Sequence, residues 1–143
     1  MILLDTHLIA DALLPPDGDT VAQDWLNQQH PDTLFLSEVG LTELKQGLKA
    51  GSNAKDVKKA IKDATQLAKD LKELFGERVL PFDEKAIAAL EQISSTAEQN
   101  EVELSLIDSM IAATALANGF QIATRDTRPF EAAGLKVINP WKK

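Results

Sequence analysis

The sequence contains no cysteine and only two histidines, His7 and His30, among its 143 residues. The lack of cysteine excludes a disulfide framework, an iron–sulfur cluster, a thiolate zinc site and a cysteine nucleophile. Two histidines are too few for a multi-histidine metal site. No apolar run approaches the roughly 20 residues that span a bilayer, and the start of the chain, Met1 to Asp5, has no basic segment of the kind that opens a signal peptide. We therefore expect a cytoplasmic protein that does not enter a membrane.

The length and composition fit a single globular domain over residues 1–143, with 44% hydrophobic and 26% charged residues. The sequence shows neither an internal repeat nor a linker that would divide it. The net charge of −7 argues against broad electrostatic binding to nucleic acid. It does not exclude a nuclease, because an acidic cluster can hold cations that reverse the local field.

The charge is unevenly distributed along the chain. Residues 45–72 contain eight lysines and three acids, which gives this segment +5 and leaves −12 for the remainder. Apolar residues recur within it at spacings of three and four: Val57, Ile61, Ala64, Leu67, Ala68, Leu71, Leu74 and Phe75. This pattern predicts a helix with a solvated lysine face. A second interpretation, compatible with the first, is a lysine stripe that guides a phosphate backbone toward an acidic site.

Short apolar runs alternate with helical patterns along the whole chain. Strands are predicted at residues 2–4, 34–36, 78–82, 120–124 and 135–139. Helix starts are predicted at Asp19 or Thr20, Ser37, Asp83 and Ser105, and helix ends or breaks at Pro15–Pro16, residues 51–53, Gly76 and Asn118–Gly119. Strands that alternate with helices predict an α/β domain, with a parallel sheet covered on both faces.

Four acids fall where such a sheet would bring them to one edge. Asp5 directly follows the first strand, and Asp126 follows the strand at residues 120–124. Glu43 lies in the helix after the second strand, and Asp108 lies in the first turn of the apolar helix that starts at Ser105. Since ligands of open parallel sheets bind beyond the carboxyl ends of the strands, we expect these four carboxylates to converge there.

Carboxylates packed together repel one another, and a divalent Mg²⁺ or Mn²⁺ ion removes that conflict. A metal held there could activate water for phosphodiester hydrolysis without cysteine, serine or histidine. Each acid also has an ordinary structural explanation. Asp5 could cap a helix, Asp108 could form a capping box, Glu43 could pair with a surface lysine, and Asp126 could be a turn residue.

Polar neighbours of these acids are further candidates. Thr6 and Thr124 could orient the carboxylates by hydrogen bonds, or could be ordinary residues at strand ends. Side chains that could contact a substrate or a partner are His7, Lys45, Arg125 and Arg128. A structural histidine and solvated surface charges are the alternatives.

Taken in order, four segments of the chain resemble the PIN-domain nucleases. They are Met1-Ile2-Leu3-Leu4-Asp5-Thr6, Leu41-Thr42-Glu43-Leu44-Lys45-Gln46-Gly47, Leu106-Ile107-Asp108-Ser109-Met110-Ile111-Ala112-Ala113-Thr114-Ala115 and Ala123-Thr124-Arg125-Asp126. The tail from Phe130 to Trp141 resembles the VapC and FitB branch of bacterial toxin–antitoxin ribonucleases.

The resemblance implies a three-layer α/β/α sandwich with a five-stranded parallel sheet, and a magnesium- or manganese-dependent endoribonuclease. It places Asp5, Glu43 and Asp108 at the acidic positions of the family, with Asp126 at one form of a fourth. Two residues depart from the pattern. Pro129 stands where this branch has a further acid, and His7 stands where asparagine or serine is usual. The resemblance also implies a homodimer that acts on RNA and is restrained by a cognate antitoxin protein.

Two other functions compete with a nuclease. One is a PIN-like binding module without catalysis, for which Pro129 and His7 are the suspicious positions. The other is an aspartate-based phosphotransfer domain. A phosphatase of that kind needs a second aspartate where His7 stands, and a receiver needs a lysine near the end of the fifth strand, whereas Lys136 lies near its start.

Overall fold

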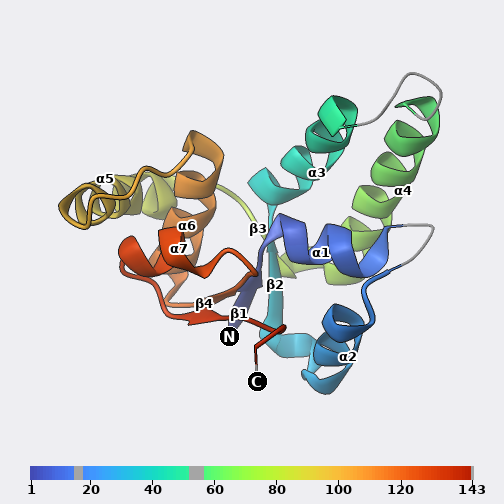
Figure 1. Cartoon of the computed structure of the whole chain (residues 1–143), viewed down its shortest axis with the longest axis horizontal. Helices are drawn as coiled ribbons and strands as arrows, with labels where there is room; N and C mark the ends of the chain where they lie inside the picture. The colour runs from blue at the N-terminus through green and yellow to red at the C-terminus, as the bar shows by residue number, and fades with distance from the viewer. Residues whose placement is uncertain (15–17, 52–56, 143) are drawn as a thin grey trace.

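Five short strands form one parallel sheet with helices on both sides (Figure 1). The computed structural model describes residues 1–14, 18–51 and 57–142. Its strands are β1 (Ile2–Leu4), β2 (Leu34–Ser37), β3 (Val79–Leu80), β4 (Gln121–Ala123) and β5 (Val137–Ile138). Its α-helices are α1 (Thr6–Leu13), α2 (Thr20–Gln28), α3 (Glu38–Gly51), α4 (Val57–Phe75), α5 (Glu84–Gln99), α6 (Leu106–Asn118) and α7 (Thr127–Ala132). Two 3₁₀ turns cover Pro31–Thr33 and Gly76–Arg78.

The strand order is β3-β2-β1-β4-β5, so β1 occupies the centre of the sheet. Every strand pair is parallel, and Ile2 of β1 lies beside Leu34 of β2 on one side and Gln121 of β4 on the other. The predicted α/β class, the five strands and their parallel arrangement are confirmed. Because all strands run in the same direction, their carboxyl ends meet at one edge of the sheet.

Alternate side chains of the strands supply two separate cores. Ile2 and Leu4 pack with Leu36 and with α1, α3 and α4, whereas Leu3 packs on the opposite face with α5, α6 and α7. Figure 1 shows these two helical layers on either side of the sheet, with α3 and α4 extending beyond it as an antiparallel pair. The period-two alternation of a strand thus produces the three layers that the resemblance implied.

Helix boundaries follow the predicted capping chemistry. The side chains of Asp19, Asp83 and Ser105 each accept a hydrogen bond from the backbone N–H three residues later, at 3.0–3.1 Å. Gly119 ends α6 in the left-handed region, with φ of 71°, which is strained for residues that carry a Cβ. This turn leads the chain directly into β4. Since α6 therefore begins at the carboxyl edge of the sheet, Asp108 in its first turn lies at that edge.

The structure differs from the sequence prediction in three places. Helix α7 was not predicted, because Pro129 and its polar neighbours gave no helical periodicity. The helical pattern that follows Asp83 assigns Ile87 to an apolar helix face, as the pattern over residues 57–75 does for Leu74, but their exposed fractions are 56% and 72%. Both residues lie at the edge of the apolar face of their helix, beyond the part of that face that neighbouring elements cover. The breaks predicted at Pro15–Pro16 and at residues 52–53 lie outside the described residues.

No helix in the described part of the chain combines the length and the apolar character needed to cross a membrane.

Candidate active site

Asp5 holds a buried carboxylate at the carboxyl end of the central strand, with 1% of the residue exposed. Its backbone N–H donates to the Ala123 carbonyl at 3.0 Å, which continues the β1–β4 pairing by one residue. Asp5 occupies the N-cap position of α1, yet its side chain makes no capping hydrogen bond. Instead Oδ2 accepts a hydrogen bond of 2.7 Å from the buried hydroxyl of Thr124. The capping interpretation of this carboxylate is therefore wrong.

Thr124 connects Asp5 to the next acid of the site. While its hydroxyl donates to Asp5, the same oxygen accepts a hydrogen bond of 3.1 Å from the backbone N–H of Asp126. The hydroxyl is thereby fixed at both ends, and it fixes the orientation of the Asp5 carboxylate. The Asp126 side chain is exposed and forms no capping hydrogen bond with α7.

Glu43 reaches the same edge because α3 packs closely against the start of α1. A Cβ at Gly40 would lie 2.8 Å from the Thr6 hydroxyl oxygen, so only glycine permits this approach. The Thr6 hydroxyl donates to the Gly40 carbonyl at 3.2 Å and also lies beside the Glu43 carboxyl. Thr6 thus ties the first turn of α1 to the helix that carries Glu43.

The three acids share one electrostatic environment. Burial raises the pKa of Glu43, opposed by Thr6, and the negative charges of Asp108 and Asp5 raise it further. Burial likewise raises the pKa of Asp108, and the charges of Asp5 and Asp126 add to the effect, while Ser105 opposes it. Charges that perturb one another in this way lie close together. Asp5, Glu43 and Asp108 thus lie within electrostatic reach of one another, and Asp126 within reach of Asp108, while their action as one site stays a prediction.

His7 is the cation of this group. Its Nδ1 lies 3.6 Å from Asp5 Oδ2, and its side chain is 69% exposed. Hydrogen bonding with the Asp5 carboxylate raises the pKa of His7 to about 9, partial burial lowers it, and the charges of Asp5, Glu43 and Asp108 raise it again. His7 is therefore protonated at neutral pH and places a positive charge at the mouth of the site.

Two carboxylate oxygens are buried without a hydrogen-bond partner among the described residues: Asp5 Oδ1 and Glu43 Oε1. Leaving such an acceptor unsatisfied typically costs about 1–3 kcal/mol, and more for a charged group. Hard oxygen donors of this kind suit Mg²⁺ or Mn²⁺. The described residues nevertheless contain no group of three His, Asp or Glu side chains already placed to hold a metal ion. A cation held by three of these carboxylates would require them to draw closer together, whereas one or two carboxylates and water are also a common arrangement for Mg²⁺.

The remaining candidates divide into two groups. Lys45 and Arg128 are exposed, as a residue that meets a substrate or a partner must be. Arg125 instead contacts its own chain, with Asp11 Oδ2 at 3.7 Å, Asp19 Oδ2 at 3.5 Å and its guanidinium 4.0 Å from the Trp141 ring centre.

Arg125, Asp19 and Trp141 form a cluster that sequence reasoning missed. The Trp141 indole N–H donates to Asp19 Oδ2 at 3.2 Å, which adds to the contacts of Arg125 with both residues. This cluster joins the loop that carries Asp126 to the start of α2 and to the end of the chain. Asp19 and Trp141 lie 122 residues apart in the sequence, so no local spacing could have indicated this cluster.

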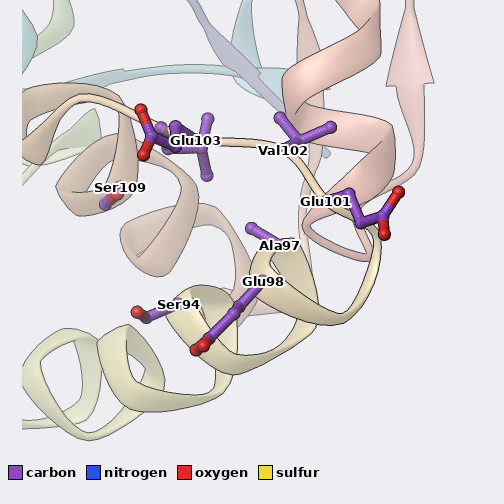
Figure 2. Close-up of a pocket in the computed structure, with 8 residues that line it drawn as sticks. Ser94, Ala97, Glu98, Glu101, Val102, Glu103 and Ser109 are labelled. Atoms are coloured by element: carbon purple, nitrogen blue, oxygen red, sulfur yellow. The ribbon is translucent and has the colours of Figure 1, made fainter.

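Figure 2 shows the residues that line a cavity, the volume of which is about 500 Å³. Its walls come from the end of α5, the connection at residues 101–104 and Ser109 of α6. None of the candidate site residues lines this cavity. The four acids and the lining of this cavity are therefore separate sets of residues.

Comparisons with known proteins agree with this arrangement. A model of the PIN domain family matches residues 2–135. The chain is 40% identical over 142 residues to VapC ribonuclease Y4jK of Sinorhizobium fredii and 38% identical over 141 residues to Toxin FitB of Neisseria gonorrhoeae. It is also 39% identical over 145 residues to Plasmid stability protein StbB of Pseudomonas syringae pv. tomato. Each alignment covers 99% of both proteins.

Solved structures show the same similarity in three dimensions. The crystal structure of FitAcB from Neisseria gonorrhoeae matches with a TM-score of 0.81 at 35% identity, over 100% of both chains. The structure of FitAB bound to an IR36 DNA fragment matches with a TM-score of 0.82, over 100% of this chain and 97% of the other. The DNA-bound VapBC structure from Salmonella typhimurium, at 20% identity and a TM-score of 0.74, supports the fold alone.

We predict that His7 titrates near pH 9 in metal-free protein. Because its pKa is raised from 6.5 to about 9, the stability that the ion pair contributes is fully present below about pH 6.5 and is lost as the pH rises through about 9. Proton NMR of the imidazole ring in EDTA measures this pKa. Asp5→Asn should shift it toward 6.5 and leave the His30 resonance unchanged. A His7 titration near 6.5 in the parent protein would contradict the prediction.

Removal of the Glu43 charge should stabilise the metal-free protein at neutral and alkaline pH. Since its folded-state pKa is raised above the ordinary value of 4.5, ionisation disfavours the folded state above the raised pKa and has no effect below about 4.5. Glu43→Gln should raise the melting temperature by about 2–4 °C near pH 8. The gain should disappear toward pH 4.5 in thermal melts. Glu91→Gln, on the exposed face of α5, is the control, and an equal gain there would refute this origin.

Proposed function

Because the chain belongs to the PIN domain family, we propose that it is a divalent-metal-dependent endoribonuclease that acts as the toxin of a toxin–antitoxin pair. The family model covers almost the whole domain, and full-length relatives at 38–40% identity are named VapC ribonuclease and toxin FitB. The resemblance inferred from the sequence motifs is thus confirmed at the level of the family. An RNA substrate implies that the protein acts in the cytoplasm.

The observation that carries this proposal is the pair of unsatisfied buried oxygens, Asp5 Oδ1 and Glu43 Oε1, in an environment where Asp108 adds a third negative charge. Solvent cannot reach these atoms freely, and no protein donor among the described residues pairs with them. A cation would satisfy both and would relieve the mutual repulsion of the acids. The same carboxylates without a cation oppose the approach of a phosphodiester.

We assign Asp5, Glu43 and Asp108 as the residues that would hold Mg²⁺ or Mn²⁺, with Asp126 as a fourth candidate. When bound there, such an ion supplies an activated water and stabilises negative charge on the phosphate oxygens. Thr124 keeps the Asp5 carboxylate oriented, and Thr6 keeps Glu43 at the start of α1.

Three exposed cations would act on the substrate side. The protonated His7 ring lies next to Asp5 and can donate a hydrogen bond to a phosphate oxygen. Lys45 and Arg128 would contact the RNA or a partner from the rim of the site. Arg125, by contrast, we assign to holding the loop of Asp126 in place, because its guanidinium is engaged with Asp11, Asp19 and Trp141.

We further propose that the protein forms a homodimer and is restrained by a small antitoxin protein. The solved structures that match it at 35% identity include FitAcB and DNA-bound FitAB, and this chain covers 100% and 97% of the matched chain in them. An acidic site is suited to a basic inhibitory segment, since complementary charge favours both encounter and specificity.

The purified protein should cleave RNA in Mg²⁺ or Mn²⁺ and lose this activity in EDTA. Asp5→Asn, Glu43→Gln and Asp108→Asn should each lower kcat/KM by at least about 100-fold, as loss of charge stabilisation in a transition state does. Glu91→Gln should remain within about twofold of the parent. Calorimetric titration with Mn²⁺ gives a second readout, in which the first three variants lose binding. Metal binding without cleavage of any RNA would favour the binding module, and phosphate transfer from a small donor to Asp5 would favour the phosphotransfer domain.

Expression of the chain alone in a bacterial host should arrest growth if it is a toxin. The Asp5→Asn variant should permit normal growth at the same protein level, because the arrest requires cleavage. Colony counts after induction, with the protein level checked by immunoblot, measure this difference. Growth arrest by both forms to the same extent would separate the toxicity from the carboxylate site and overturn this part of the proposal.

A further inference from the structure

We propose that one face of α4 is a binding surface for the RNA phosphate backbone outside the acidic site. This inference rests on the proposed nuclease function and adds to it the place where the flanking part of the substrate binds. The surface is defined by four exposed residues, here named the lysine stripe: Lys58, Lys62, Lys69 and Lys72.

The lysine stripe is aligned by the helix geometry. At 3.6 residues per turn, its four members and Thr65 fall within a sector of about 80° around the helix axis, spread over about 21 Å of its length. Asp63 and Asp70 fall roughly 120–140° away from Lys58 by the same count. Gln66 donates a hydrogen bond of 2.8 Å to Asp70 Oδ1, which keeps that carboxylate occupied on its own face. Exposed Glu73 falls about 60° from Lys58 on the side of Lys62, and Lys72 lies 3.9 Å from Glu38 Oε1, so positive charge predominates along the stripe without excluding acids from its edge.

The buried face of α4, which lies about 80–140° around the helix axis from Lys58, determines which side of the helix carries the lysines. Ala64, Ala68 and Leu71 are buried against the core that α4 shares with α3 and β1. This packing fixes the rotation of the helix about its axis, so the stripe cannot turn inward. The small alanines let α4 pack close to α3. The aliphatic stems of the lysines are therefore not needed to cover apolar surface there.

One end of the lysine stripe lies at the edge of the sheet that carries the acidic site. Lys72 lies 3.9 Å from Glu38 Oε1 in the first turn of α3, next to the end of β2. The C-terminal end of the stripe is thus at the carboxyl edge of the sheet, where the acids gather. Its other end lies out along the helix pair that extends beyond the sheet in Figure 1. Glu43 is carried by the same helix pair, on another side of α3 from Glu38.

The charge distribution selects a polyanion as the occupant. Outside residues 45–72 the chain carries −12, so a phosphate backbone is repelled by most of the surface. A stacked strand presents one phosphate for about every 3.4 Å of axis, and the length of the stripe therefore accommodates several in succession. The lysines are unevenly spaced, by about 6, 10.5 and 4.5 Å along the axis, which a flexible single strand of RNA can follow, and the proposed nuclease function makes RNA the occupant rather than an acidic peptide or a lipid headgroup.

The test compares two variants with the same charge. The stripe variant carries Lys58→Gln, Lys62→Gln, Lys69→Gln and Lys72→Gln, and the control variant carries Lys59→Gln, Lys85→Gln, Lys136→Gln and Lys142→Gln, all at exposed positions. Both are made in the Asp5→Asn background and titrated without metal against a fluorescein-labelled single-stranded RNA of about 30 nucleotides, by fluorescence anisotropy at several salt concentrations. Binding is thus measured independently of cleavage.

We expect the stripe variant to lose RNA affinity by at least about 50-fold at 0.1 M salt, and its slope of log K against log salt to become shallower by up to about 3. The control variant should keep the slope of the parent. With Asp5 restored, the stripe variant should show a raised KM on the long RNA, an unchanged kcat, and normal cleavage of a trinucleotide. A double variant, Lys62→Gln with Lys69→Gln, should show about half the change in slope if the larger variant fails to fold.

Equal losses in the stripe and control variants, or no loss in either, would overturn the proposal. Tighter binding to phosphatidylserine vesicles or to polyglutamate than to RNA would also overturn it. If no form cleaves any RNA, the proposed function fails, while the salt slopes still decide whether the stripe binds RNA.

Discussion

The buried carboxylate of Asp5 is the interaction on which the edge of the sheet depends. A charge with 1% exposure is tolerated only when neighbouring groups compensate for its lost hydration. Thr124 and His7 compensate for one of its oxygens, while the other has no partner among the described residues. Burial raises the pKa values of Glu43 and Asp108, and the same crowding of charge raises them further. An arrangement so unfavourable to the isolated chain is typical of a site kept for binding and chemistry.

Much of this arrangement could be predicted because it depends on local patterns and on the direction of the strands. Alternation along Ile2, Leu3 and Leu4 assigns side chains to two cores, and Ser105 marks the start of α6. Once the strands are parallel, topology alone brings Asp5 and Asp108 to the same edge. The acids were therefore identified from their positions relative to predicted elements, with no measurement of distance.

The features that escaped prediction depend on contacts between distant segments. Arg125 had the sequence context of a substrate contact, yet its guanidinium is engaged by Asp19 and Trp141, which no spacing connects to it. The close approach of Gly40 to Thr6 is equally invisible in sequence, because a glycine within a helix carries no sign of what lies against it. Leu74 shows the converse, since its helical period is correct but no neighbouring element covers it.

The chain has two unusual properties, which are its crowded acids and its separate lysine-rich helix. The positive helix offsets the repulsion that the acids exert on a phosphate backbone. Four carboxylates on a domain that carries −12 outside residues 45–72 would repel an RNA substrate at every distance beyond the reach of a bound cation. A cation corrects the field only at the reacting phosphate, whereas the phosphates on either side remain unpaired. Lysines placed within the acidic site would form ion pairs with the metal ligands and compete with the cation. Lysines along the neighbouring helix α4 avoid that competition and still lie near the end of β2, as the contact of Lys72 with Glu38 shows. The separation of charges along the sequence would thus let one small domain attract RNA, as proposed for the lysine stripe, and keep an anionic centre.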